Sequence, residues 1–370
     1  AERVDQIPSG TVISRALALD ASRHLAVLGR YPRWFALPDR WQTWVLSAVP
    51  VGLAMIRRHR PKVIWSTYPI ASAHWIGYIL HRLSGIPWIA DFRDPMVERN
   101  VRSGALTPAW PALRSARLAI ESRAATHAAA LTFCTDAALQ ICAQRYPSAD
   151  TSRWRVVPNG FDESAFLSAE QTLENECAIG SDDIVLLHSG TIYPTPDRDT
   201  SIFFRALKRV LDNRADGARK VKVILRASAV GDHYVALIGQ LNLQGNVVFA
   251  PALPYESALR EMLSADGLLI FQGYTSNPAI PAKLYEYFRA GRPILALADS
   301  DGETARLIRE EAAGEIAALD DEDSIVAGLG KFLHGVELGE SRIMATKRVA
   351  AFERANAAGR FADLFDMVAV

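Results

Sequence analysis

Residues 277–288, Asn-Pro-Ala-Ile-Pro-Ala-Lys-Leu-Tyr-Glu-Tyr-Phe, connect an apolar run at 267–271 to a stretch of helical periodicity at 281–290. The apolar run has the length of a buried strand, and Pro281 suits the first turn of a helix because its missing N–H needs no partner there. In an open parallel sheet, the loop after a strand lies at the edge where ligands bind. The stretch therefore predicts an α/β fold with a ligand site beside Pro281.

The same alternation of strand-like and helical patterns continues along the chain, which is typical of doubly wound parallel sheets. The first series has strands at 62–67, 87–91, 131–134 and 153–157 and helices at 71–83, 111–130 and 136–145. The second series has strands at 184–189, 221–226, 246–249, 267–271, 293–296 and 315–317 and helices at 200–213, 234–241, 255–264, 281–290, 303–311 and 324–334. We interpret the two series as Rossmann-like domains at 1–162 and 163–340, with a boundary in 159–174, followed by C-terminal helices at 341–370.

Length and composition limit the class of protein. A chain of 370 residues favours two domains over one, and 49% hydrophobic with 22% charged residues excludes a disordered or coiled-coil chain. Forty-one Lys and Arg residues balance 41 Asp and Glu residues, so the net charge gives no reason to expect nucleic acid as a partner. Cys134, Cys142 and Cys177 lack metal-ligand spacing, which predicts buried thiols in a reducing compartment.

The stretch at 41–56 is the nearest approach to a membrane span, but it is too short and too polar to be one. We expect a helix packed on the core of the first domain. A contact with a membrane surface is the alternative, because a mixture of basic and aromatic residues suits lipid headgroups. Such residues precede and enter the stretch: Arg30, Arg33, Trp34, Phe35, Arg40, Trp41 and Trp44.

Polar residues follow three predicted strands of the second domain. Ser189-Gly190-Thr191 forms a turn where the backbone could approach a ligand, and Arg226 supplies a cation suited to a diphosphate. A plain turn and a surface arginine are the alternatives. Lys283 and Glu286 share one face of their helix because they lie three residues apart. Either Lys283 binds a phosphate at the helix N-terminus and Glu286 binds ribose, or the two form a solvated ion pair.

Two pairs of carboxylates stand two residues apart, Asp197 with Asp199 and Asp299 with Asp301. Such pairs can bind a divalent cation. Both lie in polar turns, however, and Asp199 can cap the helix that follows it instead. The eight histidines show no metal-ligand spacing, so we expect neither a metal nor another cofactor.

Three motifs resemble those of GT-B glycosyltransferases, particularly family 4 and its relatives in bacterial polysaccharide assembly. Residues 281–287, Pro-Ala-Lys-Leu-Tyr-Glu-Tyr, with Ala-Gly-Arg-Pro-Ile-Leu at 290–295, are similar to the family's nucleotide-sugar signature. Val-Val-Pro-Asn-Gly-Phe-Asp at 156–162 resembles the junction of its two domains. A third match is Gly-Ile-Pro-Trp-Ile-Ala-Asp-Phe-Arg-Asp-Pro at 85–95, preceded by Ser-Thr-Tyr-Pro at 66–69 and by His74.

The resemblance implies two doubly wound domains that face each other across a cleft, with a C-terminal helix that crosses back to the first domain. It implies that Glu286 binds the ribose of a donor nucleotide and that Lys283 lies by the diphosphate. The other implied positions are Arg198 and Arg226 as diphosphate clamps, Gly190, Thr191, Ile280, Pro281 and Ala282 around the nucleotide, Pro254 and Tyr255 beside the base, and His74, Arg93, Asp94 and Asn159 on the acceptor side.

The implied reaction transfers a sugar from a nucleoside diphosphate sugar to a cell-envelope or exopolysaccharide acceptor, which can be lipid-linked. The resemblance implies retention of configuration and no metal, with Arg198, Arg226 and Lys283 stabilising the departing diphosphate. It also implies a cytoplasmic protein associated with the inner face of the membrane. A non-catalytic glycosyltransferase-like binding subunit and a nucleotide-sugar epimerase or phosphorylase of the same fold remain as alternatives.

Two features depart from the family's pattern. Pro278 stands where the family has the first glutamate of a two-glutamate motif, so the transferred sugar cannot be inferred from that position. The first domain also lacks an opening strand and a glycine-rich loop, because no strong strand precedes Gly10 or Gly29. By analogy with the family, we expect the natural protein to extend some tens of residues before Ala1.

Overall fold

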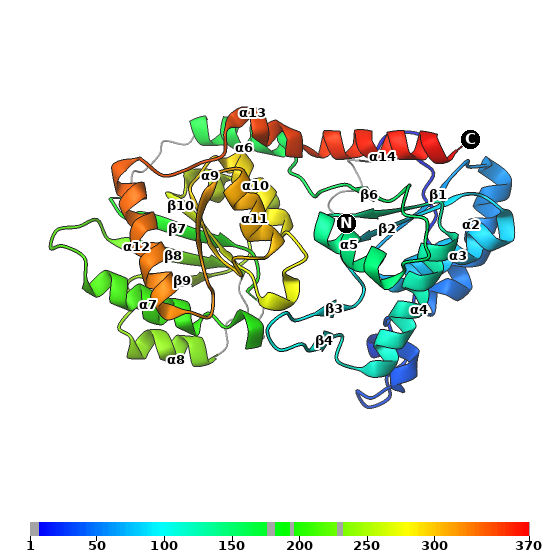
Figure 1. Cartoon of the computed structure of the whole chain (residues 1–370), viewed down its shortest axis with the longest axis horizontal. Coiled ribbons are helices and arrows are strands. Elements are labelled where there is room, and N and C mark those ends of the chain that lie inside the picture. The colour runs from blue at the N-terminus through cyan, green and yellow to red at the C-terminus, as the bar shows by residue number, and fades with distance from the viewer. Residues whose placement is uncertain (1–6, 176–181, 193–195, 228–231, 370) are drawn as a thin grey trace.

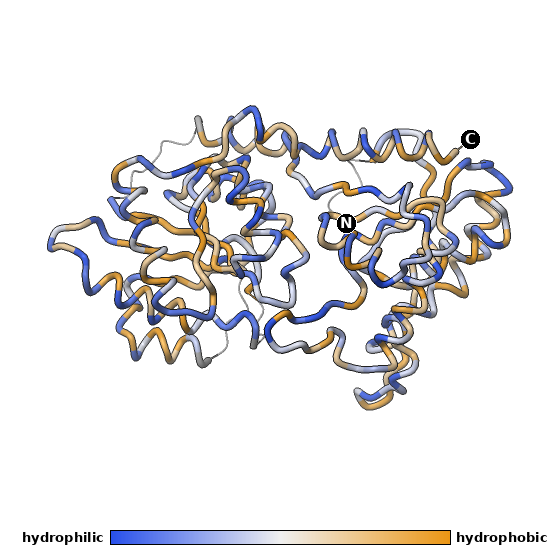
Figure 2. The backbone as a smooth tube through the Cα atoms, viewed as in Figure 1, coloured by the Kyte–Doolittle hydropathy of each residue, from blue (hydrophilic) through white to orange (hydrophobic). Residues whose placement is uncertain are grey.

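The computed structural model describes residues 7–175, 182–192, 196–227 and 232–369. These residues form two α/β domains that lie side by side, each with a parallel sheet between helices (Figure 1). Figure 2 shows hydrophobic backbone concentrated in the strands and mixed colours in the surrounding helices. This arrangement is expected for parallel sheets, whose strands are covered on both faces.

The first sheet has the order β1-β2-β5-β6, and its strands are parallel. They are β1 (Ile64–Thr67), β2 (Trp88–Arg93), β5 (Ala130–Phe133) and β6 (Arg155–Val156), close to the four predicted strands. The helices around them are α1 (Ala21–His24), η2 (Arg33–Ala36), α2 (Trp44–His59), α3 (Ala71–Ser84), α4 (Pro111–His127) and α5 (Asp136–Arg145). Trp88, Phe92 and Phe133 are buried at the centre of this domain.

The second sheet has six parallel strands in the order β12-β11-β10-β7-β8-β9. They are β7 (Ile184–Ser189), β8 (Val221–Arg226), β9 (Val247–Ala250), β10 (Gly267–Phe271), β11 (Ile294–Leu297) and β12 (Gly314–Ala317). The helices are α7 (Ser201–Asp212), α8 (Asp232–Gln240), α9 (Tyr255–Ser264), α10 (Ala282–Ala290), α11 (Glu303–Glu310) and α12 (Glu322–Leu338), with 3-10 turns η3 (Pro196–Arg198) and η4 (Tyr274–Ser276). The strand order reverses between β7 and β10, and such a switch point is where open α/β sheets bind ligands.

Two segments differ from the sequence prediction. The acidic stretch after Phe161, interpreted as part of the junction, forms helix α6 (Glu163–Asn175). Phe166 is buried with residues of α9 and α10, and Arg289 forms ion pairs with Glu163 and Glu170, so α6 packs on the second domain. The unpredicted hairpin of β3 (Glu98–Arg99) and β4 (Leu106–Thr107) projects from the first domain. Strands of two residues are too short to show a period in the sequence.

The C-terminal segment crosses back to the first domain, as the resemblance implies. It contains α13 (Thr346–Val349), η5 (Ala350–Phe352) and α14 (Arg354–Val368), and α14 lies over the first domain in Figure 1. Leu364 and Val368 pack with Ile89 and Ala130 of the first sheet. The crossing helix therefore shares an apolar core with a domain that lies more than 200 residues earlier in the chain.

The two connections between the domains contact each other at Gly160. The N–H of Phe161 donates to the Phe352 carbonyl at 3.1 Å, and the N–H of Arg354 donates to the Phe161 carbonyl at 3.0 Å. A Cβ atom at position 160 would lie 2.1 Å from the Phe352 carbonyl oxygen. Only glycine therefore allows this approach. Among the described residues, no helix is long and apolar enough to cross a membrane.

Candidate functional site

Ser189, Lys283 and Glu286, three of the polar residues predicted as a site, lie at the switch point between β7 and β10. The phenol of Tyr287, on α10, accepts a hydrogen bond from the Ser189 N–H at 2.9 Å and donates to the Leu269 carbonyl at 3.4 Å. These contacts fix α10 against the ends of both strands. The N-terminus of α10 therefore opens at the carboxyl edge of the sheet, with Pro281 as its N-cap residue.

Lys283 lies in the first turn of α10 and points toward β7. Its Nζ atom is 3.2 Å from His188 Nε2, and the Nδ1–H of His188 donates to the Leu269 carbonyl at 2.8 Å. Burial lowers the pKa of Lys283 to about 8, with a further contribution from the Arg198 charge, while Glu286 acts in the opposite direction. Burial also lowers the pKa of His188, so the neutral imidazole accepts from the lysine. A solvated ion pair does not describe this buried amine.

Gly190 makes room for Lys283. Its φ of 121° is in a region that favours glycine, and a Cβ atom there would lie 2.8 Å from Lys283 Nζ. The turn after β7 therefore lets the backbone approach a side chain of α10. Thr191 follows it and is exposed.

Arg198 is the second cation of the site. It ends η3, and its Nη2 donates to Ser276 Oγ of η4 at 2.8 Å. Its charge lowers the pKa values of both Lys283 and His188, although burial is the larger cause for each. Because Ser276 stands six residues before α10, Arg198 is bound to the loop that leads to the helix whose first turn carries Lys283. Two cations in a partly desolvated place repel each other unless an anion joins them.

Arg226 does not join this pair, although its backbone lies beside Gly190. Its Nε donates to Glu261 at 2.9 Å, its Nη2 forms an ion pair with the same carboxylate, and its Nη1 donates to the Pro251 carbonyl at 3.0 Å. The side chain is only 14% exposed. Glu261 of α9 binds the guanidinium, so the structure does not bring this predicted diphosphate clamp together with Lys283.

Glu286 and Tyr255 form the other end of the site. The Tyr255 hydroxyl donates to Glu286 Oε1 at 3.0 Å, and burial with the Glu286 charge raises the Tyr255 pKa to about 12. Pro254 is the N-cap residue of α9, directly before Tyr255. The residues predicted beside ribose and base therefore lie together, one helical turn from Lys283.

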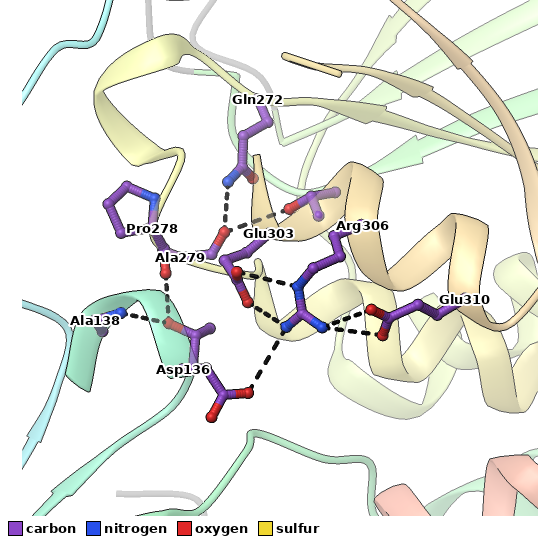
Figure 3. Close-up of polar contacts among 10 residues, drawn as sticks. Asp136, Ala138, Gln272, Pro278, Ala279, Glu303, Arg306 and Glu310 are labelled. Carbon is purple, nitrogen blue, oxygen red and sulfur yellow. Dashed lines mark hydrogen bonds and ion pairs between the residues drawn. The ribbon is translucent and has the colours of Figure 1, made fainter. Parts of the chain in front are cut away.

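The loop before α10 is shaped by side chains from both domains (Figure 3). Gln272 Nε2 donates to the carbonyls of Ser276 at 2.7 Å and Ala279 at 2.8 Å. From the first domain, Thr135 Oγ1 donates to the Pro278 carbonyl at 2.5 Å. Pro278, which stands where the family has a glutamate, thus supplies a backbone carbonyl that contacts the first domain. Ile280 behind it is buried, whereas Ala282 is exposed.

Three predicted acceptor-side residues lie at the carboxyl edge of the first sheet. Arg93 ends β2 with a φ of 58°, a strained value for a residue other than glycine, next to a bulge between β2 and β5. Its Nη2 donates to Asn159 Oδ1 at 2.7 Å. Asp94 follows, and burial raises its pKa against the opposing charge of Arg93. A strained backbone that holds charged groups at a sheet edge is typical of functional sites.

Comparison with known proteins assigns the first domain. Residues 10–160 match the sequence model described as a glycosyl transferase 4-like domain. The first domain is therefore similar to a glycosyl transferase 4-like domain, and the match covers less than half of the chain. No curated protein matches the sequence.

Solved structures show the same two-domain fold. Sucrose-phosphate synthase from Thermosynechococcus elongatus is similar with a TM-score of 0.68 and 15% identity, over 92% of this chain and 80% of that one. Trehalose 6-phosphate synthase from Burkholderia multivorans gives a TM-score of 0.62 and 13% identity, over 92% and 78%. HepE from Anabaena, solved in complex with UDP, gives 0.57 and 16%, over 88% and 81%. These likenesses confirm the predicted GT-B fold.

His74 is not exposed at the carboxyl edge of the first sheet, which corrects its predicted place on the acceptor side. The side chain is fully buried, with Nδ1 2.7 Å from Ser66 Oγ and its ring 4.6 Å from that of Phe92. Burial lowers its pKa to about 3, so the imidazole is neutral. His74 lies on the face of α3 that packs on the sheet, and the sequence motif does not indicate that this face is buried.

The two carboxylate pairs serve as loop and cap contacts. Asp199 Oδ1 accepts from the N–H and hydroxyl of Ser201, at 3.0 and 2.7 Å, at the start of α7. Asp299 accepts from Asn277 Nδ2 and from the Asp301 N–H. The described part of the chain holds no group of three or more His, Cys, Asp or Glu residues placed to bind a metal ion. Cys134 and Cys142 are buried free thiols, and Cys177 lies outside the described residues.

One residue near the site has no signal in the sequence motifs. Glu98 begins β3, four residues after Asp94, and burial with the charge of Asp94 raises its pKa to about 7. The charges of Arg198 and Arg117 act against that rise. The sequence does not reveal this residue, because its surroundings depend on where the β3–β4 hairpin lies relative to the second domain.

Proposed function

We propose that the protein is a glycosyltransferase that binds a nucleoside diphosphate sugar at the carboxyl edge of its second sheet. The observation that carries the proposal is that Lys283 lies in the first turn of α10 while Arg198 is hydrogen-bonded to Ser276 in the loop before that helix. In this proposal, the diphosphate lies between the two cations, the ribose hydroxyls bind Glu286, and the base lies along Pro254 and Tyr255. Thr191, Ile280 and Ala282 would border the nucleotide.

Two cations at the start of α10 are unfavourable in the absence of an anion. A buried lysine whose pKa has fallen to about 8 is destabilised in its charged form by lost hydration and by Arg198. A diphosphate would offset both effects, and the N-terminal dipole of α10 adds to the attraction. HepE, whose fold is similar, was solved with UDP bound, which supports a nucleotide in this fold.

The proposed reaction breaks the bond between the anomeric carbon and the diphosphate oxygen, and the electron pair leaves with the diphosphate. Lys283 and Arg198 stabilise that developing charge, which is usually the largest contribution of such a site. The acceptor hydroxyl forms the new glycosidic bond, and its proton passes to the departing phosphate. We propose retention of configuration without a metal ion, since this route needs only cations and dipoles at the diphosphate.

The acceptor would approach from the edge of the first sheet, where Arg93, Asp94 and Asn159 lie together. We propose a carbohydrate acceptor of the cell envelope or of an exopolysaccharide, either free or linked to a lipid. A lipid-linked acceptor would place the protein at the inner face of the membrane, in the cytoplasm. The exposed Trp34, in a basic segment, supports contact with such a surface.

The experiment is calorimetry of the protein with a panel of nucleoside diphosphates, followed by measurement of donor hydrolysis and of transfer to cell-envelope extracts. We expect one base to bind, and Glu286→Ala to weaken its binding about 10- to 100-fold because a charge-assisted contact to ribose is lost. Lys331→Ala is the matched control, since Lys331 pairs with Glu315 on the surface at β12.

Each outcome separates the alternatives. No binding by any nucleotide would refute the proposal. Binding without turnover would favour the non-catalytic subunit. Conversion of the sugar without transfer to any acceptor would favour an epimerase, and consumption of inorganic phosphate would favour a phosphorylase.

A further inference from the structure

The hairpin of β3 and β4 reaches from the first domain to the second. We call residues 96–108 the arm, and Figure 1 shows it between the two sheets. Its near end is held by the first domain, where the Met96 N–H donates to Glu121 Oε2 at 3.3 Å and the Val97 carbonyl accepts from Arg145 Nη2 at 2.9 Å. Arg145 and the buried Glu121 form an ion pair. The arm is therefore anchored where it leaves the first domain.

The tip of the arm is shaped by Asn100. Its N–H donates to the Ala105 carbonyl at 2.8 Å, and its Oδ1 accepts from the N–H groups of Arg102 and Ser103 at 3.0 and 2.9 Å. Asn100 is buried, although it lies on a projecting hairpin. These bonds hold the tip in one backbone conformation, from which the side chains of Asn100 and Arg102 contact the second domain.

The contacts of the arm fall on η4, the turn between β10 and α10. Asn100 Nδ2 donates to Thr275 Oγ1 at 3.1 Å. Arg102 Nη2 donates to the Tyr274 hydroxyl at 3.0 Å, and Arg102 Cζ lies 4.3 Å from the centre of the Tyr274 ring. Arg102 also pairs with Asp320 at 3.2 Å, and the Tyr274 hydroxyl donates to the same carboxylate. Two of the three residues of η4 are therefore bonded to the first domain.

The third residue of η4 binds Arg198. Ser276 Oγ accepts from Arg198 Nη2 at 2.8 Å. The turn η3, which ends at Arg198, also contacts η4 through Asp197, whose Oδ2 accepts from the Thr275 N–H at 3.3 Å. A Cβ atom at Gly273 would lie 2.5 Å from the Asp197 carbonyl oxygen, so the two turns pack closely. The turn η4 thus stands between the arm and the guanidinium that the proposed function assigns to the diphosphate.

We propose that Arg102 is a positioning residue of the donor site, which fixes η4 and through it the guanidinium of Arg198. This inference rests on the proposed function and adds a contact from the first domain to it. A guanidinium that is held in place before the ligand arrives loses less conformational freedom on binding, which raises the affinity. The diphosphate site is therefore complete only when the arm lies on η4.

The experiment measures binding of UDP, or of the nucleoside diphosphate that the panel selects, by calorimetry. Arg102→Met removes the contacts with the Tyr274 hydroxyl and with Asp320 but keeps a long side chain. We expect the affinity to fall about 3- to 10-fold, a factor that corresponds to the net contribution of a hydrogen bond. The Tm should change little, because an exposed ion pair stabilises the fold weakly. Arg102→Lys keeps the charge and a donor, and should restore most of the affinity.

A double-mutant cycle shows whether the effect passes through η4. Ser276→Ala removes the contact with Arg198 and should weaken binding of UDP by itself. In that background Arg102→Met should have almost no further effect, because the turn no longer holds the guanidinium. A purely structural contact of the arm would instead give losses that multiply.

Arg205→Met is the matched control, because Arg205 of α7 forms an exposed ion pair with Glu322 at 3.1 Å. This variant should bind UDP as the wild type does. Thr275→Val breaks the Asn100 contact from the side of the second domain and should also weaken binding, which preserves the test if Arg102→Met folds poorly. Wild-type affinity in Arg102→Met and Thr275→Val, or losses that multiply in the double variant, would overturn this inference and leave the proposed function intact. No binding of any nucleoside diphosphate by the wild type would overturn both.

Discussion

Replacing Lys283 by methionine should stabilise the fold while it weakens donor binding. Lys283 is largely buried, and its pKa falls from 10.5 to about 8. At about 1.36 kcal/mol for each tenfold change, keeping the amine charged at pH 7 costs about 3 kcal/mol of folding free energy. Methionine removes that cost but also removes the contact with His188 Nε2, which stabilises the fold by about 1 kcal/mol. The expected net gain is about 2 kcal/mol at pH 7.

The pH dependence gives this prediction its specific form. Below pH 8, the folded wild type carries the charged amine and the whole cost. Between pH 8 and 10.5 the folded protein loses the proton more readily than the unfolded chain, so the stability of the wild type rises with pH. The advantage of Lys283→Met should therefore shrink over that interval and disappear near pH 10, where the charge cost has fallen to the roughly 1 kcal/mol lost with the His188 contact. Donor affinity should fall about 10- to 100-fold at pH 7 because a charge-assisted contact is lost.

The assay is urea unfolding of wild type and Lys283→Met at pH 7 and pH 10, with donor calorimetry at pH 7. Lys331→Met is the control. Lys331 is an exposed residue of α12 that pairs with Glu315 of β12, and its replacement should change neither the unfolding free energy nor the donor affinity. A Lys283→Met protein that is less stable than the wild type at pH 7 would refute the reasoning on burial. An unchanged donor affinity would refute the assignment of Lys283 to the diphosphate.

Two further substitutions test structural roles. Gly160→Ala should destabilise the protein by about 1–3 kcal/mol, because its Cβ atom would lie 2.1 Å from the Phe352 carbonyl oxygen. A Tm equal to that of the wild type would show that the two interdomain connections can move apart without cost. Arg226→Met should lower the Tm, because it leaves Glu261 without its ion pair, at a cost of about 1–3 kcal/mol. The KM for the donor should stay unchanged, and a large increase in KM would instead restore Arg226 as a diphosphate clamp.

The sheets could be predicted because their signals are local. The strands at Ile184–Ser189, Val221–Arg226 and Gly267–Phe271 have the predicted bounds, since each is an apolar run closed by turn residues. The positions after these strands could also be found, because parallel strands bring their carboxyl ends to one edge. Lys283 and Glu286 were located in this way.

Contacts between distant segments could not be predicted in the same way. Arg226 suits a phosphate by its position, but its partner Glu261 lies on another helix, and the sequence does not show that pairing. His74 lies in a predicted helix whose buried face depends on the sheet beneath it. Asn100, in the hairpin of β3 and β4, contacts Thr275 of the second domain, 175 residues later, and such a contact leaves no local pattern in the sequence. The domain limits at 162 and 340 stay predictions.

The central claim is that Lys283, Arg198 and Glu286 bind one nucleotide sugar at the N-terminus of α10. A crystal structure of the protein with the nucleotide selected by the binding panel tests it most directly. We predict diphosphate oxygens within hydrogen-bond distance of Lys283 Nζ and the Arg198 guanidinium, and ribose hydroxyls on the Glu286 carboxylate. A nucleotide bound away from α10, or one whose diphosphate contacts neither cation, would contradict the account.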